Sequence, residues 1–319
     1  MLTRLPLPWT NVYGASRSLL ALGTAATLAF SNSATLFRPV AYSGDNPSCE
    51  GVEAGGAFCQ VSAGHLDWMR WACVVMLLVA ASGWRPRLTA LPHAYVSFSA
   101  FTGIAITDGG DQLTTVLSLL LAVPALGDRR RWHWGHPEPD AHTRPGWVLA
   151  GVSALVVVRL QMSFVYFQAV VSKLPHAEWA DGTGMWYWGN SLAFGVPGWL
   201  HTLVGPVLAN PVGVAALTWA PLFVEISLAA TLLLPQRVRF FTLTAGVIFH
   251  FSIAVMMGLW SFAMAMWAGL LLLCMPLGAT LQLRPSRSGD DADAEDAPTR
   301  AAQPARTKAT VSASDNPAS

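Results

Sequence analysis

The sequence predicts an all-α polytopic membrane protein, a bundle of about eight transmembrane helices. Of its 319 residues, 53% are hydrophobic and only 12% are charged, whereas soluble domains contain about 25% charged residues. The mean hydropathy is +0.43. The net charge is only +1 and the longest basic run is Arg129-Arg130-Arg131, so the chain lacks the basic surface that nucleic-acid binding requires.

The spans follow from the length of apolar helix that a bilayer needs, about 20 residues. We predict spans at 16–36, 67–83, 91–107, 111–127, 146–172, 211–234, 240–258 and 262–282. The segment Asp108-Gly109-Gly110-Asp111 predicts a tight turn between the third and fourth spans. Glycines and prolines interrupt residues 191–209, so we expect an interfacial excursion there. The first segment could instead be a cleaved signal peptide.

The arginines of the short loops predict the orientation, because cytoplasmic loops are enriched in Arg and Lys. With eight spans, these arginines all fall on one side: Arg4, Arg85, Arg87, Arg129, Arg130, Arg131, Arg237, Arg239, Arg284 and Arg287. Both termini are then cytoplasmic in a multi-pass protein of the cell membrane. We expect a transmembrane domain over 1–282. Residues 283–319 are rich in Ala, Asp, Pro, Ser and Thr, which predicts a disordered cytoplasmic tail.

The 37–66 loop, which the orientation places outside the cytoplasm, carries Cys49 and Cys59. Extracytoplasmic compartments are oxidising, so we predict a disulfide between them that staples the loop. Redox catalysis is the less favoured alternative, because it usually uses a closer Cys-x-x-Cys pair.

The 146–172 span carries Arg159, Tyr166 and, at its outer end, Lys173, the only lysine outside the tail. A spacing of seven residues leaves each about 20° from the last, so the three share one helix face. Because a charge inside the membrane needs a partner, we expect Arg159 to pair with Glu225. His250 lies at a similar depth. These residues form either a functional polar interior or a structural ion pair with a core histidine.

Lys173 and the Asp108–Asp111 turn are the candidate catalytic residues. A lysine in an apolar pocket becomes a better base because burial disfavours its charged form, although a lysine at a helix end can simply extend to the interface. Asp108 and Asp111 could hold a proton, bind a cation or face Lys173 as counter-ions. They could equally cap two helices, with Asp111 as an N-cap. We expect no metal centre.

Three segments resemble the sporulation-delaying protein SdpB family, part of the horizontally transferred transmembrane (HTTM) domain group. They are Asn11-Val-Tyr-Gly-Ala-Ser-Arg17, Asp108-Gly-Gly-Asp-Gln-Leu, and Arg159 to Gly182 with its Lys173-Leu and Trp179-Ala-Asp-Gly. That group includes the vitamin-K-dependent gamma-glutamyl carboxylases, in which a lysine in a matching context deprotonates reduced vitamin K. The resemblance therefore implies that Lys173 is a base and that a membrane quinone is a candidate cofactor.

Two departures from the carboxylases argue against glutamate carboxylation. The carboxylases need a histidine near the position of Asp111, and they carry a large lumenal domain that has no counterpart here. SdpB-like proteins are implicated in producing a secreted peptide toxin with a small partner protein and a toxin precursor. We therefore expect either a membrane maturation enzyme or a non-catalytic chaperone or export factor for the precursor. A transporter is less favoured, because no broken helices are arranged in matching halves.

Overall fold

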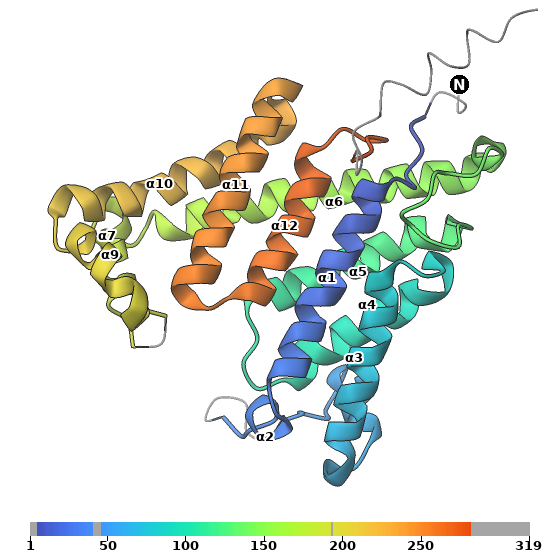
Figure 1. The fold of residues 1–319 in the computed structure, drawn as a ribbon, viewed down its shortest axis with the longest axis horizontal. Helices are drawn as coiled ribbons and strands as arrows, with labels where there is room; N and C mark the ends of the chain where they lie inside the picture. The colour runs from blue at the N-terminus through green and yellow to red at the C-terminus, as the bar shows by residue number, and fades with distance from the viewer. Residues whose placement is uncertain (1–4, 41–45, 193, 282–319) are drawn as a thin grey trace, which may run out of the picture. The chain divides into compact units, whose positions relative to one another are not determined.

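A computed structural model describes residues 5–40, 46–192 and 194–281, which form a bundle of α-helices (Figure 1). The longer helices are α1 (Asn11–Phe30), α3 (Leu66–Ser82), α4 (Pro86–Gly103), α5 (Gly109–Gly127), α6 (Pro145–Lys173), α10 (Pro211–Ala229), α11 (Gln236–Met257) and α12 (Trp260–Cys274). The shorter ones are α2 (Ser33–Leu36), α7 (Ala177–Ala180), α8 (Gly184–Gly189) and α9 (Gly198–Leu208). The predicted all-α fold is confirmed.

Each of the eight predicted spans overlaps one of the longer helices. Five helices are both long and apolar enough to cross a membrane: Ala63–Ser82, Gly109–Gly127, Pro145–Lys173, Pro211–Leu233 and Gln236–Met257. The count of eight is therefore approximate. The predicted excursion at 191–209 contains only the 11-residue helix α9, which is about 16 Å long and too short to cross.

The predicted boundaries differ from the structure most at the two ends of the bundle. The first helix begins at Asn11 instead of residue 16, because the Thr10 side chain accepts a hydrogen bond from the Tyr13 backbone N–H and caps the helix. The last helix ends at Cys274 instead of residue 282. Met275 is extended, which is the conformation that the following Pro276 favours.

The central helix of the bundle is α12, which contacts α1, α5, α6 and α11. On one side of it, α1 packs against α3, and α5 packs against α4. On the other side, α10 packs against both α6 and α11. The largest buried cluster joins these two sides, because it contains Leu117 of α5, Val158 and Met162 of α6, and Leu270 of α12.

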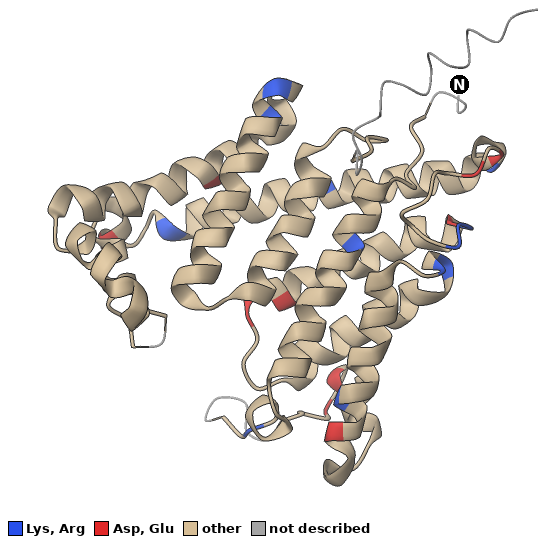
Figure 2. Ribbon diagram, in the orientation of Figure 1, with Lys and Arg blue, Asp and Glu red and all other residues tan. Residues whose placement is uncertain are grey.

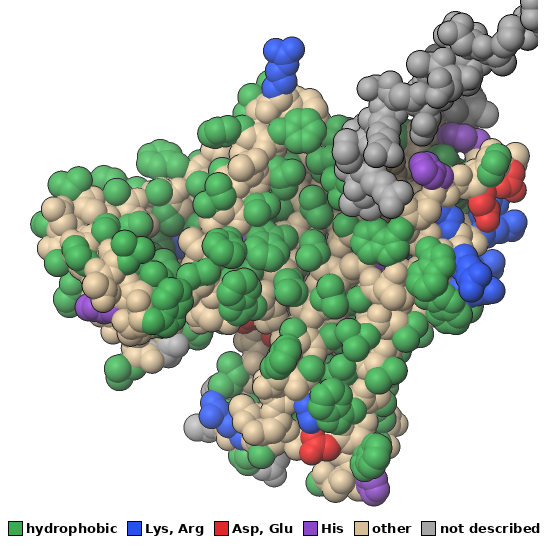
Figure 3. Space-filling model, in the orientation of Figure 1, with side chains coloured by type: hydrophobic (Ala, Val, Ile, Leu, Met, Phe, Trp, Pro, Cys, Tyr) green, Lys and Arg blue, Asp and Glu red, His purple; other side chains and the backbone are tan. Residues whose placement is uncertain are grey.

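The outer face of the bundle is apolar. Large hydrophobic side chains such as Phe223 of α10 and Phe241 of α11 are exposed, and hydrophobic side chains cover most of the face seen in Figure 3. Lys, Arg, Asp and Glu gather mainly at helix ends and in loops (Figure 2). A helix bundle with this surface is solvated by lipid, so the chain is a membrane protein in contact with membrane lipid.

The two ends of the described bundle meet at one point. Asn11 Nδ2 donates to the Leu281 carbonyl at 2.6 Å, and the Leu281 N–H donates to Asn11 Oδ1 at 2.7 Å. Residues 11 and 281 therefore lie at the same end of the bundle, as an even number of crossings requires. That this end is cytoplasmic stays a prediction. The predicted tail at 283–319 lies outside the described residues.

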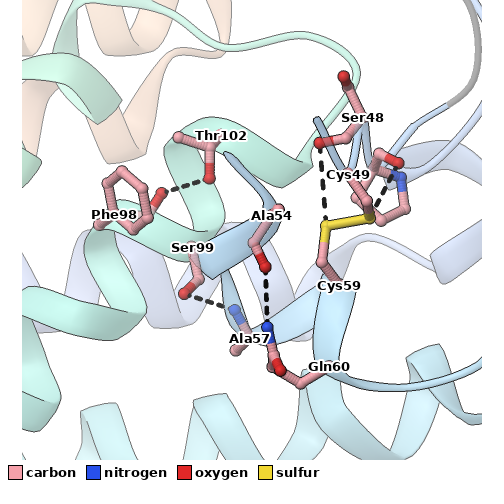
Figure 4. The surroundings of a disulfide bond; sticks show 10 residues. Ser48, Cys49, Ala54, Ala57, Cys59, Gln60, Phe98, Ser99 and Thr102 are labelled. Carbon is pink, nitrogen blue, oxygen red and sulfur yellow. Dashed lines mark hydrogen bonds between the residues drawn. A yellow bond between two sulfur atoms is a disulfide. The ribbon is translucent and has the colours of Figure 1, made fainter. Parts of the chain in front are cut away.

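The predicted disulfide is present in the loop before α3 (Figure 4). Cys49 and Cys59 are bonded, with their Cα atoms 5.6 Å apart. The loop also packs on α4, because the Ala57 N–H donates to Ser99 Oγ at 2.9 Å and Phe58 is buried against Phe37. The disulfide therefore closes a loop that packing already holds in place.

Candidate functional site

The candidate site is a cavity of about 710 Å³ walled by α6, α10, α11 and α12. Its lining is almost entirely apolar or aromatic, with four titratable side chains: Tyr166, Lys173, Glu225 and His250. Cavities of roughly 300–1,000 Å³ with mostly apolar walls and a few placed polar groups are typical of small-molecule sites. The chain therefore encloses a site suited to a hydrophobic molecule with a small polar group.

The main polar feature of the cavity is an ion pair between Lys173 and Glu225. Lys173 Nζ lies 2.6 Å from Glu225 Oε1 and 2.7 Å from Oε2, so both carboxylate oxygens accept from one ammonium group. The Lys173 side chain is 24% exposed and that of Glu225 only 7%. The lysine is thus the more accessible member of the pair, and the glutamate is its buried counter-ion.

The segment after α6 holds an aromatic ring beside this lysine. Lys173 Nζ lies 5.4 Å from the centroid of the Trp179 ring, within the range of a cation–π interaction. Gly182 makes this approach possible, because its φ of +83° favours glycine and an added Cβ would lie 3.1 Å from Trp219. The Trp219 indole N–H in turn donates to the Trp179 carbonyl. Trp179 is therefore part of the site rather than of an aromatic belt alone.

Asp181 in the same segment is held charged by its neighbours. The N–H and the hydroxyl of Thr183 both donate to Asp181 Oδ1, at 3.0 and 2.6 Å. These hydrogen bonds lower the pKa of the Asp181 carboxyl. The same hydrogen bonds close the turn that follows Trp179.

Tyr166 and His250 form the inner wall of the cavity. Their rings lie edge to face, with centroids 5.9 Å apart, and both side chains are about 1% exposed. His250 Nδ1 donates to the Gly246 carbonyl at 2.8 Å, which leaves Nε2 as the acceptor. The Tyr166 hydroxyl has no hydrogen-bond partner among the described residues. Two polar atoms are thereby available to a bound molecule.

The expected pair between Arg159 and Glu225 is wrong. Arg159 Nε donates to the Leu272 carbonyl at 3.0 Å, and Nη2 donates to the Met275 carbonyl. Arg159 therefore caps the C-terminus of α12, where free carbonyls and the helix dipole favour a cation. The sequence did not indicate these carbonyl partners, because the last helix was expected to continue past Met275. Of the three residues predicted on one face, Tyr166 and Lys173 line the cavity and Arg159 does not.

Asp108 and Asp111 form a capping box at the start of α5. Asp108 Oδ1 accepts from the Gly110 and Asp111 N–H groups, and Asp111 Oδ2 accepts from the Asp108 N–H. The N-cap is Asp108, not Asp111 as expected. The carboxylate that meets Lys173 is Glu225, and of this turn only Gly109 lines the cavity. Gly110 is needed for packing, because a Cβ there would lie 2.6 Å from Phe262 Cα.

Several cavity residues carry no signal in the sequence. Phe249, Met256, Met257 and Phe262 line it, and each reads in the sequence as an ordinary apolar residue of a span. Met256 and Met257 also line a neighbouring hollow of about 410 Å³ beside Trp199 and Trp260. Only the packing of α11 against α12 reveals these residues. Over 5–40, 46–192 and 194–281, no three His, Cys, Asp or Glu side chains are placed to hold a metal ion.

Comparisons with known proteins match one family model and two relatives along most of the chain. The HTTM domain family model matches residues 134–277, which contain every cavity-lining residue except Gly109. The chain is 34% identical to uncharacterized protein YitO of Bacillus subtilis over 277 residues, 86% of this chain and 88% of YitO. It is 32% identical to sporulation-delaying protein SdpB of Bacillus subtilis over 273 residues, 85% of this chain and 83% of SdpB. No solved structure matches.

Proposed function

Because the chain belongs to the SdpB family of HTTM-domain membrane proteins, we propose that it acts in the production or maturation of a secreted peptide toxin. Its partners would be the toxin precursor and a small partner protein, which the family resemblance suggests. The observation that supports a chemical role within this process is the Lys173–Glu225 pair on the wall of an apolar cavity.

In the favoured function, Lys173 acts as a base on the extracytoplasmic side of the membrane. Glu225 stabilises the ammonium form of Lys173, so the lysine becomes a base only after its proton passes to Glu225. The donor and acceptor atoms already lie 2.6 Å apart, so this transfer needs no movement of the backbone. A ligand that excludes water from the cavity favours the neutral pair, because an apolar surrounding penalises separated charges.

The cavity also fits a membrane quinone, the cofactor that the resemblance to the carboxylases suggests. Phe249 and Phe262 would flank its ring, and the Lys173–Glu225 pair would meet one of its oxygens. When bound in its reduced quinol form, it would supply redox chemistry and an acidic hydroxyl. The chain's own contribution would be to orient that group, exclude water and accept its proton at Lys173 Nζ.

The alternative function is a non-catalytic chaperone or export factor for the precursor. The segment over α8 and α9 favours it, because Trp186, Tyr187 and Trp199 are exposed there, while Met185 and Trp188 line the cavity. An apolar peptide segment could bind along these aromatic side chains and reach the cavity. In this function Lys173 and Glu225 would contribute only structure and charge.

Toxin output from cells expressing Lys173→Arg tests the enzymatic function. Arginine keeps the positive charge and the pairing with Glu225 but does not lose its proton. If Lys173 is a base, output falls at least 100-fold while the variant accumulates in the membrane at the normal level. The matched control is Arg237→Lys at the exposed start of α11, which should leave output unchanged.

The same assay distinguishes the chaperone function. Normal output from Lys173→Arg at normal abundance would exclude the base and leave the non-catalytic function. The variants Trp186→Ala and Trp199→Ala would then reduce output, with loss of precursor that co-purifies with the protein. If Lys173 is a base, those variants retain at least part of the output.

A further inference from the structure

A second group of buried polar side chains lies between α1, α4 and the loop at 128–135, remote in sequence from the cavity residues. We call Tyr13, Arg17, His93 and His133 the Arg17 cluster. All four side chains are almost fully buried, with exposed fractions of 0–1%. Arg17 lies within electrostatic range of the other three, and its guanidinium carbon is 5.9 Å from the Tyr13 ring centroid.

Each member of the cluster has a buried polar atom without a partner. The unpaired atoms are Arg17 Nη1, Tyr13 Oη, His93 Nε2 and His133 Nδ1, none of which meets a hydrogen-bond partner in the described part of the chain. Arg17 Nη2 donates to Thr89 Oγ1 at 3.2 Å. A buried donor or acceptor left unpaired costs about 1–3 kcal/mol. Arg17 acts on the Tyr13 hydroxyl at longer range, but His93 and His133 have no such partner for these nitrogens, so the cluster has more buried polar atoms than its own side chains satisfy.

His133 is held in the cluster by close packing. Its ring fits against Gly14 and Gly83, where an added Cβ would lie 2.8 and 2.4 Å from it. Ser18 Oγ donates to the Ala81 carbonyl at 2.5 Å and lies 3.3 Å from His133 Nε2. The Ser18 oxygen therefore accepts from His133 Nε2–H, and His133 Nδ1 is an acceptor to which no described group donates. Burial and the charges of Arg17 and Arg130 lower the pKa of His133 to about 3, so this ring is neutral.

Among residues 5–40, 46–192 and 194–281, no carboxylate forms an ion pair with Arg17. The acid that acts electrostatically on the cluster is Asp128, and both of its oxygens accept from Arg130, at 2.8 and 2.9 Å. The charged groups that face the cluster are therefore Arg17, Arg130 and Asp128, which leave one positive charge in excess. A buried charge is normally paired or hydrogen-bonded on all sides.

We propose that the Arg17 cluster binds a small monovalent inorganic anion, such as chloride. Arg17 Nη1–H and the Tyr13 hydroxyl would donate to it, and His93 would be the third donor in the tautomer that carries its proton on Nε2. A water beside the anion would donate to His133 Nδ1. Gly14 and Gly83 pack so closely against His133 that neither admits a Cβ, so the surroundings of the cluster favour a small ligand, in contrast to the apolar cavity.

Thermal unfolding of the purified full chain in detergent tests this site. Chloride replaces gluconate at constant ionic strength, so that general screening does not change. We expect the Tm to rise by about 3 °C for each tenfold increase in chloride above its dissociation constant. Bromide should act in the same way. A Tm that is indifferent to the exchange of chloride for gluconate would overturn the proposal.

Variants assign the effect to these residues. Tyr13→Phe removes one donor without changing shape, so the chloride-dependent rise in Tm should shrink while the Tm in gluconate stays near that of the wild type. Arg17→Gln, if it folds, should abolish the rise. Tyr95→Phe is the matched control, because Tyr95 is exposed on α4, and it should keep the full rise. An equal rise in Tyr13→Phe and in the control would reject the site.

A crystal grown in bromide provides a direct observation. An anomalous peak between Arg17, Tyr13 and His93 would support the anion. Water molecules alone at that position, with no anomalous signal, would show that the cluster is a hydrated polar core and would contradict the proposal.

Discussion

The two halves of the bundle each bury a cation, but they surround it differently. In the half formed by α6, α10, α11 and α12, Lys173 faces a cavity of about 710 Å³ and is paired with Glu225. In the half formed by α1, α3, α4 and α5, Arg17 is 1% exposed and forms no ion pair with a carboxylate of the described part of the chain. A cation therefore borders a large apolar cavity in one half and is enclosed by side chains in the other.

The packing of the helices accounts for this difference. The spans of the first half are 28% buried in α3 and 50% buried in α5, whereas those of the second half are 33% buried in α6 and 22% buried in both α10 and α11. The first half is additionally held by the disulfide and by His133, which packs against two glycines. The first half is therefore on average the more closely packed one and would maintain the shape of the bundle, while the second half contains the cavity in which the proposed larger molecule would bind.

The largest expected effect comes from breaking the Lys173–Glu225 ion pair. Lys173→Met leaves Glu225 buried without a partner and should lower the free energy of unfolding by about 3–5 kcal/mol. The double variant Lys173→Met, Glu225→Leu should recover most of this loss, because an apolar pair replaces the ion pair. Thermal unfolding in detergent measures both. A double variant no more stable than the worse single variant would show that the two side chains are not coupled.

Arg159, on the same helix as Lys173, should be purely structural. Arg159→Met removes two charge-assisted hydrogen bonds to carbonyls at the end of α12, and we expect a loss of about 3 kcal/mol. Arg159→Lys should restore part of it, since a lysine can still donate to one carbonyl. Exchanging the charges in Arg159→Glu, Glu225→Arg should give less folded protein than either single change. Recovery in that double variant would instead reveal a direct pair.

Removal of the disulfide tests how much the half formed by α1, α3, α4 and α5 depends on the loop before α3. Replacing both Cys49 and Cys59 by serine should cost about 3 kcal/mol in the chain-entropy model, with toxin output unchanged at the temperature where the variant stays folded. Packing of Phe58 and Ala57 on α4 should preserve the rest of the loop. Stoichiometric thiol labelling of either cysteine in non-reduced protein would refute the bond.

The smallest expected effect is a dependence of folding stability on pH that originates from His133. The pKa of His133 is lowered to about 3 in the folded protein, against about 6.5 in an unfolded chain. Its contribution to stability is therefore fully present above pH 6.5 and is lost as the pH falls toward 3. At pH 5 the loss is about 2 kcal/mol. His133→Gln should flatten the dependence of Tm on pH between 7 and 5, and an unchanged slope would contradict it.

The sequence alone was sufficient for features that depend on local composition and spacing. The all-α membrane fold follows from apolar segments of about 20 residues, and the Asp108–Asp111 turn follows from two glycines between acids that can cap a helix. The pairing of Cys49 with Cys59 follows from their position in one short loop. In each case the interacting groups lie close in the chain, so no knowledge of helix packing is needed.

Only the tertiary structure decided which partner each buried charge meets. The sequence placed Arg159, Tyr166 and Lys173 on one face and matched Arg159 to Glu225 by estimated depth. That estimate failed because α6 has 29 residues, more than a bilayer requires, and a helix of that length tilts or projects beyond it. The midpoints of two spans then do not mark the same depth. Arg159 caps a helix because α12 ends near it. Lys173 meets Glu225 because of the way α6 packs against α10.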